Sequence, residues 1–529
     1  MSAPAAGTAR PRRDTRPPAA RSAAPSLRLV RTPDGVRAAG AHEARLGHAV
    51  GGHDLDDPAV PEGVFASWRW DGGRLLVRTD RYGMFPLFYR AGAGSIALST
   101  RVEELLTPGE DAEPDHDALA VFVRLGFFLA EDTCFTGIRA LPPAATLTWT
   151  PAAGVRIDAG ERGPRGTVDT DRERAVDGFV ELFRAAVARR LPPAPYLLPL
   201  SGGRDSRHIL LELCRQGVPP KLCVSGAKFP PDPGADAEVA AALARRLGLA
   251  HRTLTPRRSQ FRAELTANTA QSMTTLDGAW TLPLLAYLGR HSPVTYDGIG
   301  GGELAQNPSI GLIRDLPREL SAPAALPELA DTLLRAAGRT GPHIDWLLGP
   351  RHAALWSQER ARARLVAELA RHRDAAFPLG SFFFWNRTRR SIAMAPYALA
   401  PASTVVHAPY LDHALFDHLS TVPHRHLIDG DFHDRALARA YPEHDGFPFA
   451  AAVPGRHGAA LARHRLAYLG RLYGHALAAE PRWLRAGEGM LGRLLAAGRG
   501  PGGPVRVSRL LPLTLYLLQL ESLATGRTT

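Results

Sequence analysis

Lysine and cysteine are scarce in this sequence. Lys221 and Lys228 are its only lysines, and arginine supplies every other strongly basic side chain. The three cysteines, Cys134, Cys214 and Cys223, form no CxxC pair, so the sequence predicts neither a zinc site nor a disulfide framework. Unpaired thiols are typical of a reducing compartment, and we expect a cytoplasmic protein.

Long apolar segments are missing as well. The N-terminus lacks the apolar core of a signal peptide. The most apolar run, residues 510–518, is too short to span a bilayer and contains Pro512. We interpret this run as part of a buried C-terminal helix and expect no contact with a membrane.

Positive charge is in excess, with a formal net charge of +12 and a pI of about 10.1. Residues 1–31 contain seven arginines and one acid, so half of the excess lies in this short stretch. The remainder is spread thinly, which argues against a nucleic-acid-binding surface. Residues 1–25 are mostly Pro, Ala and Arg without periodicity, and this composition predicts a disordered tail.

A length of 529 residues predicts two or three domains. Residues 26–157 contain short apolar runs, at 63–68, 74–78 and 95–98, separated by Gly, Pro and Asp, which indicates strands. Residues 158–168 are rich in Gly, Arg and acids and are predicted to form a linker. The C-terminal part divides into a domain at 169–455 and a helical extension at 456–529.

Strands and helices alternate in the first half of the second domain. An amphipathic helix is predicted at 171–191, a strand at 196–200, a second strand at 222–225 and a helix at 235–249. A further strand-like run occupies residues 294–296. This alternation predicts a doubly wound parallel sheet.

The sharpest motif runs from Ser201 to Ser206, with the sequence SGGRDS between an apolar strand and a helix. Gly202 and Gly203 allow a tight turn and close approach to a ligand. The following helix offers free N–H groups and a positive dipole end, which suits a pyrophosphate. Asp205 is a poor phosphate partner but a good Mg²⁺ ligand.

A simpler interpretation of this motif is a glycine turn followed by a helix cap, which is common. The strand before it, the helix after it and the order of its residues together favour the phosphate loop. The SGGRDS motif matches neither the Walker A sequence nor the dinucleotide-binding fingerprint.

With these residues in view, the sequence resembles the asparagine synthetase family of the class B, glutamine-hydrolysing type, a branch of the N-type ATP pyrophosphatases. The loop 201–206 resembles its pyrophosphate loop, and 221–226 resembles the strand whose end contacts adenine. Residues 296–304 resemble its second Gly-rich loop. Further similar segments are 236–251, 407–413 and, in the glutamine amidotransferase domain, 78–89.

The resemblance implies an α+β glutaminase-like N-terminal domain of stacked antiparallel sheets, followed by an α/β ATP pyrophosphatase domain with a helical C-terminal part. It implies ATP and Mg²⁺ as cofactors. The expected ATP-binding residues are Ser201, Gly202, Gly203, Asp205, Ser206, Ser225, Gly226, Gly300 and Gly301. The expected metal ligands are Asp205, Asp297 and Glu303.

The glutaminase half departs from the family pattern. Active members begin at a cysteine whose thiol attacks glutamine. Here position 2 is Ser2, and no cysteine precedes Cys134, which we expect in a late strand of the domain. The domain is therefore predicted to keep its fold without hydrolysing glutamine, so that free ammonia or another amine is the nucleophile.

The synthetase half departs as well. Gly302 replaces a metal-binding Asp of the second Gly-rich loop, with Glu303 next to it, and Ile299 replaces an acid. The family's catalytic lysine has no counterpart. Arg456 is the nearest cation, and arginine binds phosphate but does not release a proton as lysine does. The expected catalytic residues are Asp205, Glu303 and Arg456.

Other candidates carry less weight. Lys228 is predicted either to contact ATP phosphates or to be exposed. His208 is predicted to be structural, and the histidines between 407 and 433 to lie at the surface and at helix caps, because they show no metal-binding spacing. The Phe-rich run 382–385 is expected in the core or in the wall of an acceptor pocket.

The resemblance implies an ATP-dependent ligase that adenylates a small-molecule or peptide carboxylate and forms an amide with ammonia or an amine. A peptide macrolactam cyclase and a nucleotide-binding pseudoenzyme are the alternatives. No nucleic-acid or membrane partner is expected, and homodimer formation stays open.

Overall fold

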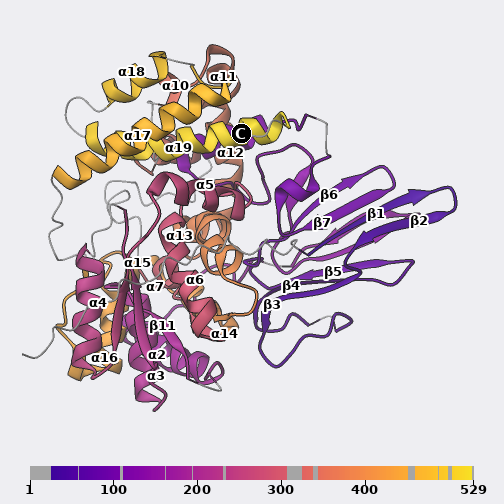
Figure 1. Ribbon diagram of the computed structural model, residues 1–529. Helices are drawn as coiled ribbons and strands as arrows, with labels where there is room; N and C mark the ends of the chain where they lie inside the picture. The colour runs from indigo at the N-terminus through magenta and orange to yellow at the C-terminus, as the bar shows by residue number, and fades with distance from the viewer. Residues whose placement is uncertain are drawn as a thin grey trace, which may run out of the picture.

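Two antiparallel sheets form one end of the molecule, and helices around a small parallel sheet form the other (Figure 1). The computed structural model describes residues 25–57, 59–107, 111–160, 162–192, 195–229, 234–306, 325–337, 344–450, 459–485, 488–497 and 503–526. The predicted tail at 1–25 lies outside these residues except for Pro25.

Each N-terminal sheet has five strands. The first is ordered β2-β1-β7-β6-β8 and the second β10-β9-β5-β4-β3. Their bounds are β1 Ser26–Thr32, β2 Gly35–Gly40, β3 Glu43–Ala49, β4 Gly63–Trp70, β5 Leu75–Thr79, β6 Phe88–Gly92, β7 Ser95–Ser99, β8 Ile138–Ala140, β9 Thr146–Thr150 and β10 Gly154–Asp158. The strands predicted at 63–68, 74–78 and 95–98 are confirmed as β4, β5 and β7.

The two sheets bury a shared apolar core. Leu27 and Leu98 come from the first sheet, and Trp68 and Trp149 from the second, all at most 1% exposed. The indole Nε1–H of Trp68 donates to the Ala41 carbonyl at 2.7 Å, so its polar atom is satisfied. Large apolar side chains at alternating positions thus explain why the two sheets stack.

The expectation of a strand at Cys134 is wrong. Cys134 lies in the loop between helix α1 (His116–Leu125) and β8, where the chain turns toward the sheet. The side chain is completely buried, and burial raises the pKa of the thiol well above its usual value. A buried, protonated thiol is a poor nucleophile.

A parallel sheet organises the second domain. β11 (Leu197–Pro199), β12 (Leu222–Gly226) and β13 (His251–Leu254) pair in parallel, and β14 (Val294–Tyr296) pairs in parallel with β15 (Val405–His407). The two groups meet at β11 and β14 through side chains. Leu197 N–H donates to Ser292 Oγ at 2.9 Å, and Thr295 Oγ1 donates to the Leu197 carbonyl at 3.0 Å.

Helices connect these strands, as the sequence pattern predicts. Helix α2 (Arg172–Ala188) precedes β11, α3 (Arg204–Arg215) follows it, α4 (Gly234–Arg246) follows β12, and α6 (Leu282–His291) precedes β14. The predicted apolar face of α2 is confirmed, because Phe179 and Phe183 are fully buried. Parallel strands with helical connections bring the carboxyl ends of β11, β12 and β14 to one edge.

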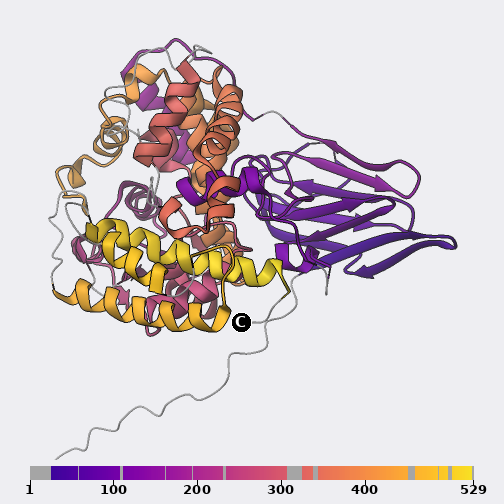
Figure 2. The same ribbon diagram turned by 90° about the horizontal axis from the view of Figure 1, so that it is seen from above.

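Helices also form the C-terminal part. α17 (Ala459–Ala479), α18 (Glu488–Ala497) and α19 (Gly503–Ala524) lie together at the top of Figure 1, and α17 and α19 run side by side in both views (Figures 1 and 2). In α19, Tyr516 stacks on Phe122 of α1 with ring centroids 4.5 Å apart. The predicted buried helix at 510–518 is confirmed, and none of the helices described has the length and apolar character needed to cross a membrane.

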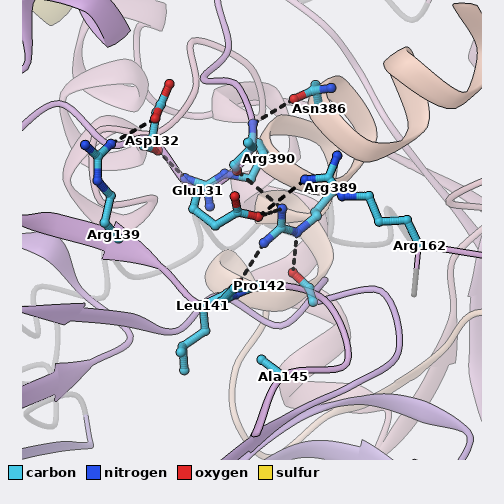
Figure 3. Close-up of polar contacts among 12 residues, drawn as sticks. Glu131, Asp132, Arg139, Leu141, Pro142, Ala145, Arg162, Asn386, Arg389 and Arg390 are labelled. Atoms are coloured by element: carbon cyan, nitrogen blue, oxygen red, sulfur yellow. Dashed lines mark hydrogen bonds and ion pairs between the residues drawn. The ribbon is translucent and has the colours of Figure 1, made fainter. Parts of the chain in front are cut away.

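One helix ties the two domains together. η7 (Phe384–Ile392) carries Arg389, which is 2% exposed and forms an ion pair with Glu131 at 3.1 Å (Figure 3). Arg389 also donates to the carbonyls of Gly83, Ala130 and Leu141. Its neighbour Arg390 donates to the Asp132 carbonyl at 2.7 Å. Within the second domain, the same helix contacts Glu303 through Arg387 and lines the candidate site described next through Ile392. The N-terminal domain therefore packs against a helix that forms part of the wall of this site.

Candidate active site

The SGGRDS segment forms a hydrogen-bonded turn between β11 and α3. Ser201 N–H donates to Ser206 Oγ at 3.0 Å, and the two hydroxyl oxygens are 2.9 Å apart. Gly203 N–H donates to Ser201 Oγ at 3.2 Å, and Gly202 N–H donates to Asp236 Oδ1 at 2.9 Å. The structure thus holds the predicted loop in a defined shape.

Helix α3 begins at this turn without a side-chain cap. Its N-cap residue is Gly203, which has an extended backbone and no side chain that could accept a hydrogen bond from the first turn. The simpler interpretation, a capped turn, therefore does not describe this helix start. Uncapped N–H groups and the helix dipole leave the turn suited to an anion.

Asp205 packs against the second Gly-rich loop. A Cβ added at Gly298 would lie 2.5 Å from Asp205 Cβ, and one added at Gly301 would lie 2.6 Å from Asp205 Oδ1. Gly300 has a φ of +93°, in the left-handed region, and is the N-cap of the short helix α7 (Gly301–Ala305). Glycine at these positions lets the loop lie directly against the carboxylate.

Negative charge is concentrated around Asp205. Burial, followed by the charges of Glu303 and Asp297, raises the pKa of Asp205 to about 8. Burial also raises the pKa of Asp297 to about 6, although Ile299 N–H donates to its Oδ1 at 2.8 Å. Such clustering of carboxylates disfavours their charged forms unless a cation is near.

Three nitrogen-bearing side chains lie within 3.5 Å of these acids. Gln306 Nε2 donates to Asp205 Oδ1 at 3.2 Å, and Arg387 Nη1 donates to Glu303 Oε1 at 3.3 Å. His433 Nδ1 lies 3.5 Å from Asp205 Oδ1. Asp205 therefore has a fixed position on the protein side while 31% of its side-chain surface stays accessible.

A buried aromatic cluster lies behind Asp205. His433 Nε2 is 3.1 Å from His208 Nδ1 and 3.2 Å from the Tyr410 hydroxyl. Burial lowers the pKa of His433 to about 3, so the ring is neutral. The prediction of surface histidines is wrong for His433, which is fully buried, for His407, which is 8% exposed, and for His426, which is 9% exposed. Their burial depends on distant segments and has no signal in the local sequence.

These elements surround a cavity of about 480 Å³. The predicted residues that line it are Ser201, Asp205, Ser206, Ser225, Gly226, Asp297, Gly300 and Glu303, and Gly302 lines it as well. Gly202, Gly203 and Gly301 stand beside it in the two loops and are not part of its wall. Sequence reasoning missed the wall residues Trp280, Leu284 and Pro396, which belong to segments without a motif.

At one end of the cavity, Gly226 lies against Trp280 and Leu284. The added Cβ at Gly226 would lie 3.3 Å from the Trp280 ring, so the strand end and the indole stand close together. Ser225 Oγ lies 2.6 Å from the Leu200 carbonyl and 2.8 Å from His251 Nε2. Lys228 is 61% exposed, and its ammonium group lies 5.6 Å from the Trp280 ring centroid and 3.7 Å from Asp236. Trp280 gives this end of the cavity an aromatic ring on which a planar base can stack. Lys228 is exposed, which agrees with one of its two predicted positions.

A second, much smaller cavity adjoins Glu303. Its volume is about 50 Å³, and Phe384, Trp385 and Arg162 are among its wall residues. The Phe-rich run 382–385 is buried, as predicted for a core or pocket wall. The predicted catalytic residue Arg456 lies outside the described residues.

The residues fit a Mg²⁺ ion only if phosphate supplies part of the coordination. Within the described ranges no three His, Cys, Asp or Glu side chains stand close enough to ligate one ion together. Mg²⁺ at nucleotide sites uses one or two carboxylates together with phosphates and waters. Asp205 suits this role because it faces the cavity and is repelled by two neighbouring acids, a repulsion that a cation would relieve.

Comparison with known families agrees with this arrangement. A family model described as a glutamine amidotransferase domain matches residues 52–158, and one described as asparagine synthase matches residues 178–443. A search of curated proteins gave no match. The second match spans half of the chain and contains both glycine loops. The chain belongs to the asparagine synthase family, whose ATP pyrophosphatase fold and ATP-dependent ligase chemistry account for the cavity at the ends of its parallel strands.

Proposed function

We propose that this ligase adenylates a substrate carboxylate and then joins the acyl group to ammonia or an amine, releasing AMP and pyrophosphate. One observation carries the proposal. The SGGRDS turn and the second Gly-rich loop converge on Asp205 at one cavity of about 480 Å³, where the parallel strands end. Ligands of open parallel sheets bind at this edge.

The chain's own groups suit the parts of ATP. The uncapped start of α3 offers N–H donors to the pyrophosphate, and the hydroxyls of Ser201 and Ser206 lie beside it. The end of the cavity lined by Gly226, Trp280 and Leu284 accepts the adenine ring. A carboxylate substrate would attack the α-phosphorus between these two ends, and its bond to phosphorus would form as the bond to pyrophosphate breaks.

Mg²⁺, when bound, would supply positive charge to the leaving pyrophosphate. Asp205 would hold it, with Glu303 or Asp297 as the second carboxylate. Asp205 has the more accessible side chain, 31% exposed against 8% for Glu303. Asp297 accepts from Ile299 N–H, and Glu303 is engaged by Arg387.

We further propose that the amine does not come from glutamine hydrolysed by this chain. Cys134 and Cys223 are completely buried, and Cys214 lies in α3, so none of the three cysteines in this sequence is placed as an exposed nucleophile in the N-terminal domain. Burial raises the pKa of Cys214 to about 11, which keeps that thiol protonated near neutral pH.

Pyrophosphate release from Mg-ATP tests the proposal. The enzyme is incubated with a panel of carboxylates led by aspartate, with and without ammonium, beside Asp205→Asn and the exposed control Asp158→Asn. We expect release that requires one carboxylate, that persists in Asp158→Asn and that is lost in Asp205→Asn. ATP binding without release for any carboxylate would favour a nucleotide-binding scaffold instead.

A further inference from the structure

A larger cavity separates the two domains. Its volume is about 940 Å³, twice that of the ATP cavity. Its wall comes from β3, the loop before β6 and the loop after β7 on one side, and from α6, η8 (Ala395–Leu399) and β15 on the other. Nothing in the ATP chemistry described above uses this space.

The charge of the wall has one sign. Arg45, Arg101 and Arg290 line the cavity together with His48, and no Asp or Glu does so among the described residues. Arg45 contacts Glu43 at the surface, and Arg101 contacts Glu103. Arg290 is exposed and has no ion pair within the described ranges. The rest of the wall is mainly Ala, Leu, Val, Pro and Phe85, so an occupant needs apolar groups and negative charge.

Two sheet edges border the same space. β3 is the last strand of its sheet, and β15 is the last strand of the β14–β15 pair. The edges come together where the rings of His48 and His407 are 4.9 Å apart, and the cavity lies beside this contact. An edge strand presents unpaired backbone N–H and C=O groups, which bind an extended peptide by adding it as another strand.

The cavity is next to the site of ATP chemistry. Pro396 of η8 lines both cavities, and α6 contributes Leu284 to one and Ala286 to the other. Tyr397 lines the larger cavity and is 9% exposed, and its hydroxyl has no hydrogen-bond partner among the described residues. Burial, and after it the carboxylates of Asp297 and Asp80, raise the pKa of Tyr397.

Size and charge narrow the choice of occupant. A water occupies about 30 Å³ in the liquid, so the cavity is far larger than the passage of ammonia requires. The chain's own N-terminal segment carries arginines and would repel the arginines of the wall. An acidic peptide with apolar side chains matches the charge, the apolar surface and the strand edges together.

We propose that this cavity binds an acidic polypeptide in extended form, paired along the edge of β3, and that this polypeptide brings the reacting carboxylate or amine to the ATP site. The assignment deepens the proposed ligase function and rests on it for the reaction. The binding step itself involves only the cavity.

Binding is measured by fluorescence anisotropy with the full chain. The probe is a labelled peptide of about ten residues that alternates Leu and Glu, long enough to pair along one strand. Three comparison probes are used: the same peptide with Lys for Glu, the same peptide with alternate backbone nitrogens methylated, and a single-stranded oligouridylate. The double variant Arg45→Glu/Arg290→Glu reverses charge at two exposed wall positions, and Arg258→Glu reverses an exposed charge elsewhere.

We expect the Leu-Glu peptide to bind the wild type and Arg258→Glu alike, and to bind the double variant about tenfold more weakly, as two exposed ion pairs imply. The Lys peptide should prefer the double variant, and methylation should weaken binding. Equal binding of the Leu-Glu and Lys peptides, no effect of the double variant, or tighter binding of the oligouridylate would overturn the proposal.

Mg-ATP binding by calorimetry separates this proposal from the ligase function. The double variant and Arg258→Glu should both bind Mg-ATP as the wild type does, because none of the three changed arginines lines the ATP cavity. A wild-type protein that binds Mg-ATP but does not bind the Leu-Glu peptide refutes the peptide site alone. Peptide binding without ATP binding by the wild type would keep the docking site and refute the ligase function.

Discussion

Gly301→Ala tests whether the second glycine loop holds Asp205 in place. The added Cβ would lie 2.6 Å from Asp205 Oδ1 and 2.8 Å from Cγ, and 3.0 Å from the Tyr410 ring. Rotation of the carboxylate does not relieve the contact with Cγ. Tyr410 is completely buried and blocks movement on the other side, so Asp205 itself must shift.

The size of the shift sets the size of the effect. Ordinary van der Waals contact begins at 3.4 Å, so the carboxylate oxygen must retreat by about 0.8 Å. A misplacement of about 1 Å lowers a rate by roughly 100-fold, and we expect Gly301→Ala to release pyrophosphate about 30- to 100-fold more slowly. Overpacking should lower the free energy of unfolding by about 1–3 kcal/mol.

Gly302→Ala is the matched control. The nearest atom to its added Cβ is Asp205 Oδ2 at 3.9 Å, an ordinary contact, so the rate should fall by less than about threefold. The measurements are pyrophosphate release at several Mg²⁺ concentrations and unfolding by urea. The reasoning is refuted if Gly301→Ala keeps the wild-type rate, or if Gly302→Ala loses as much.

Three further predictions concern pH, the domain junction and adenine. Glu264 accepts hydrogen bonds from α17 and from its own helix α5 (Gln260–Ala270). Burial raises the pKa of this carboxyl from 4.5 to about 7. The folded state therefore holds this proton more tightly, and stability falls as pH rises from about 4.5 to 7, by at most about 3 kcal/mol. Glu264→Gln should flatten urea-unfolding curves over this range, and an unchanged slope would contradict the assignment. Arg389→Ala removes one partner of a buried ion pair and should cost about 3–5 kcal/mol in the free energy of unfolding. Arg371 is about half exposed and contacts Glu131 and Glu368, and Glu368 keeps Arg162, Arg364 and His372 without it, so Arg371→Ala should cost less than about 1 kcal/mol. Equal losses would show that the burial of Arg389 is unimportant. Trp280→Ala should raise the KM for ATP about tenfold, as the loss of one base-stacking contact implies, and Lys228→Ala should change it by less than about threefold. An unchanged KM in Trp280→Ala would place adenine elsewhere.

The sequence alone determined the elements whose cause is local. The SGGRDS turn, the strand before it and the amphipathic helix α2 follow from residues that are neighbours in the chain, so pattern and turn chemistry predict them. The family resemblance rests on the same short segments and predicted both domains. Glycine at 298 and 301 was visible as a motif, but the contact with Asp205 that requires it was not.

Only the tertiary structure decided which distant groups share an environment. His433 lies more than 200 residues from Asp205 in sequence, and the two meet because α16 (Phe432–Ala440) packs against α2 and α3. The break between β11 and β14, the burial of Cys134 and the cationic cavity between the domains likewise depend on contacts between segments far apart in the chain. Local propensity carries no information about such contacts, because their free energy is gained only when both segments are folded.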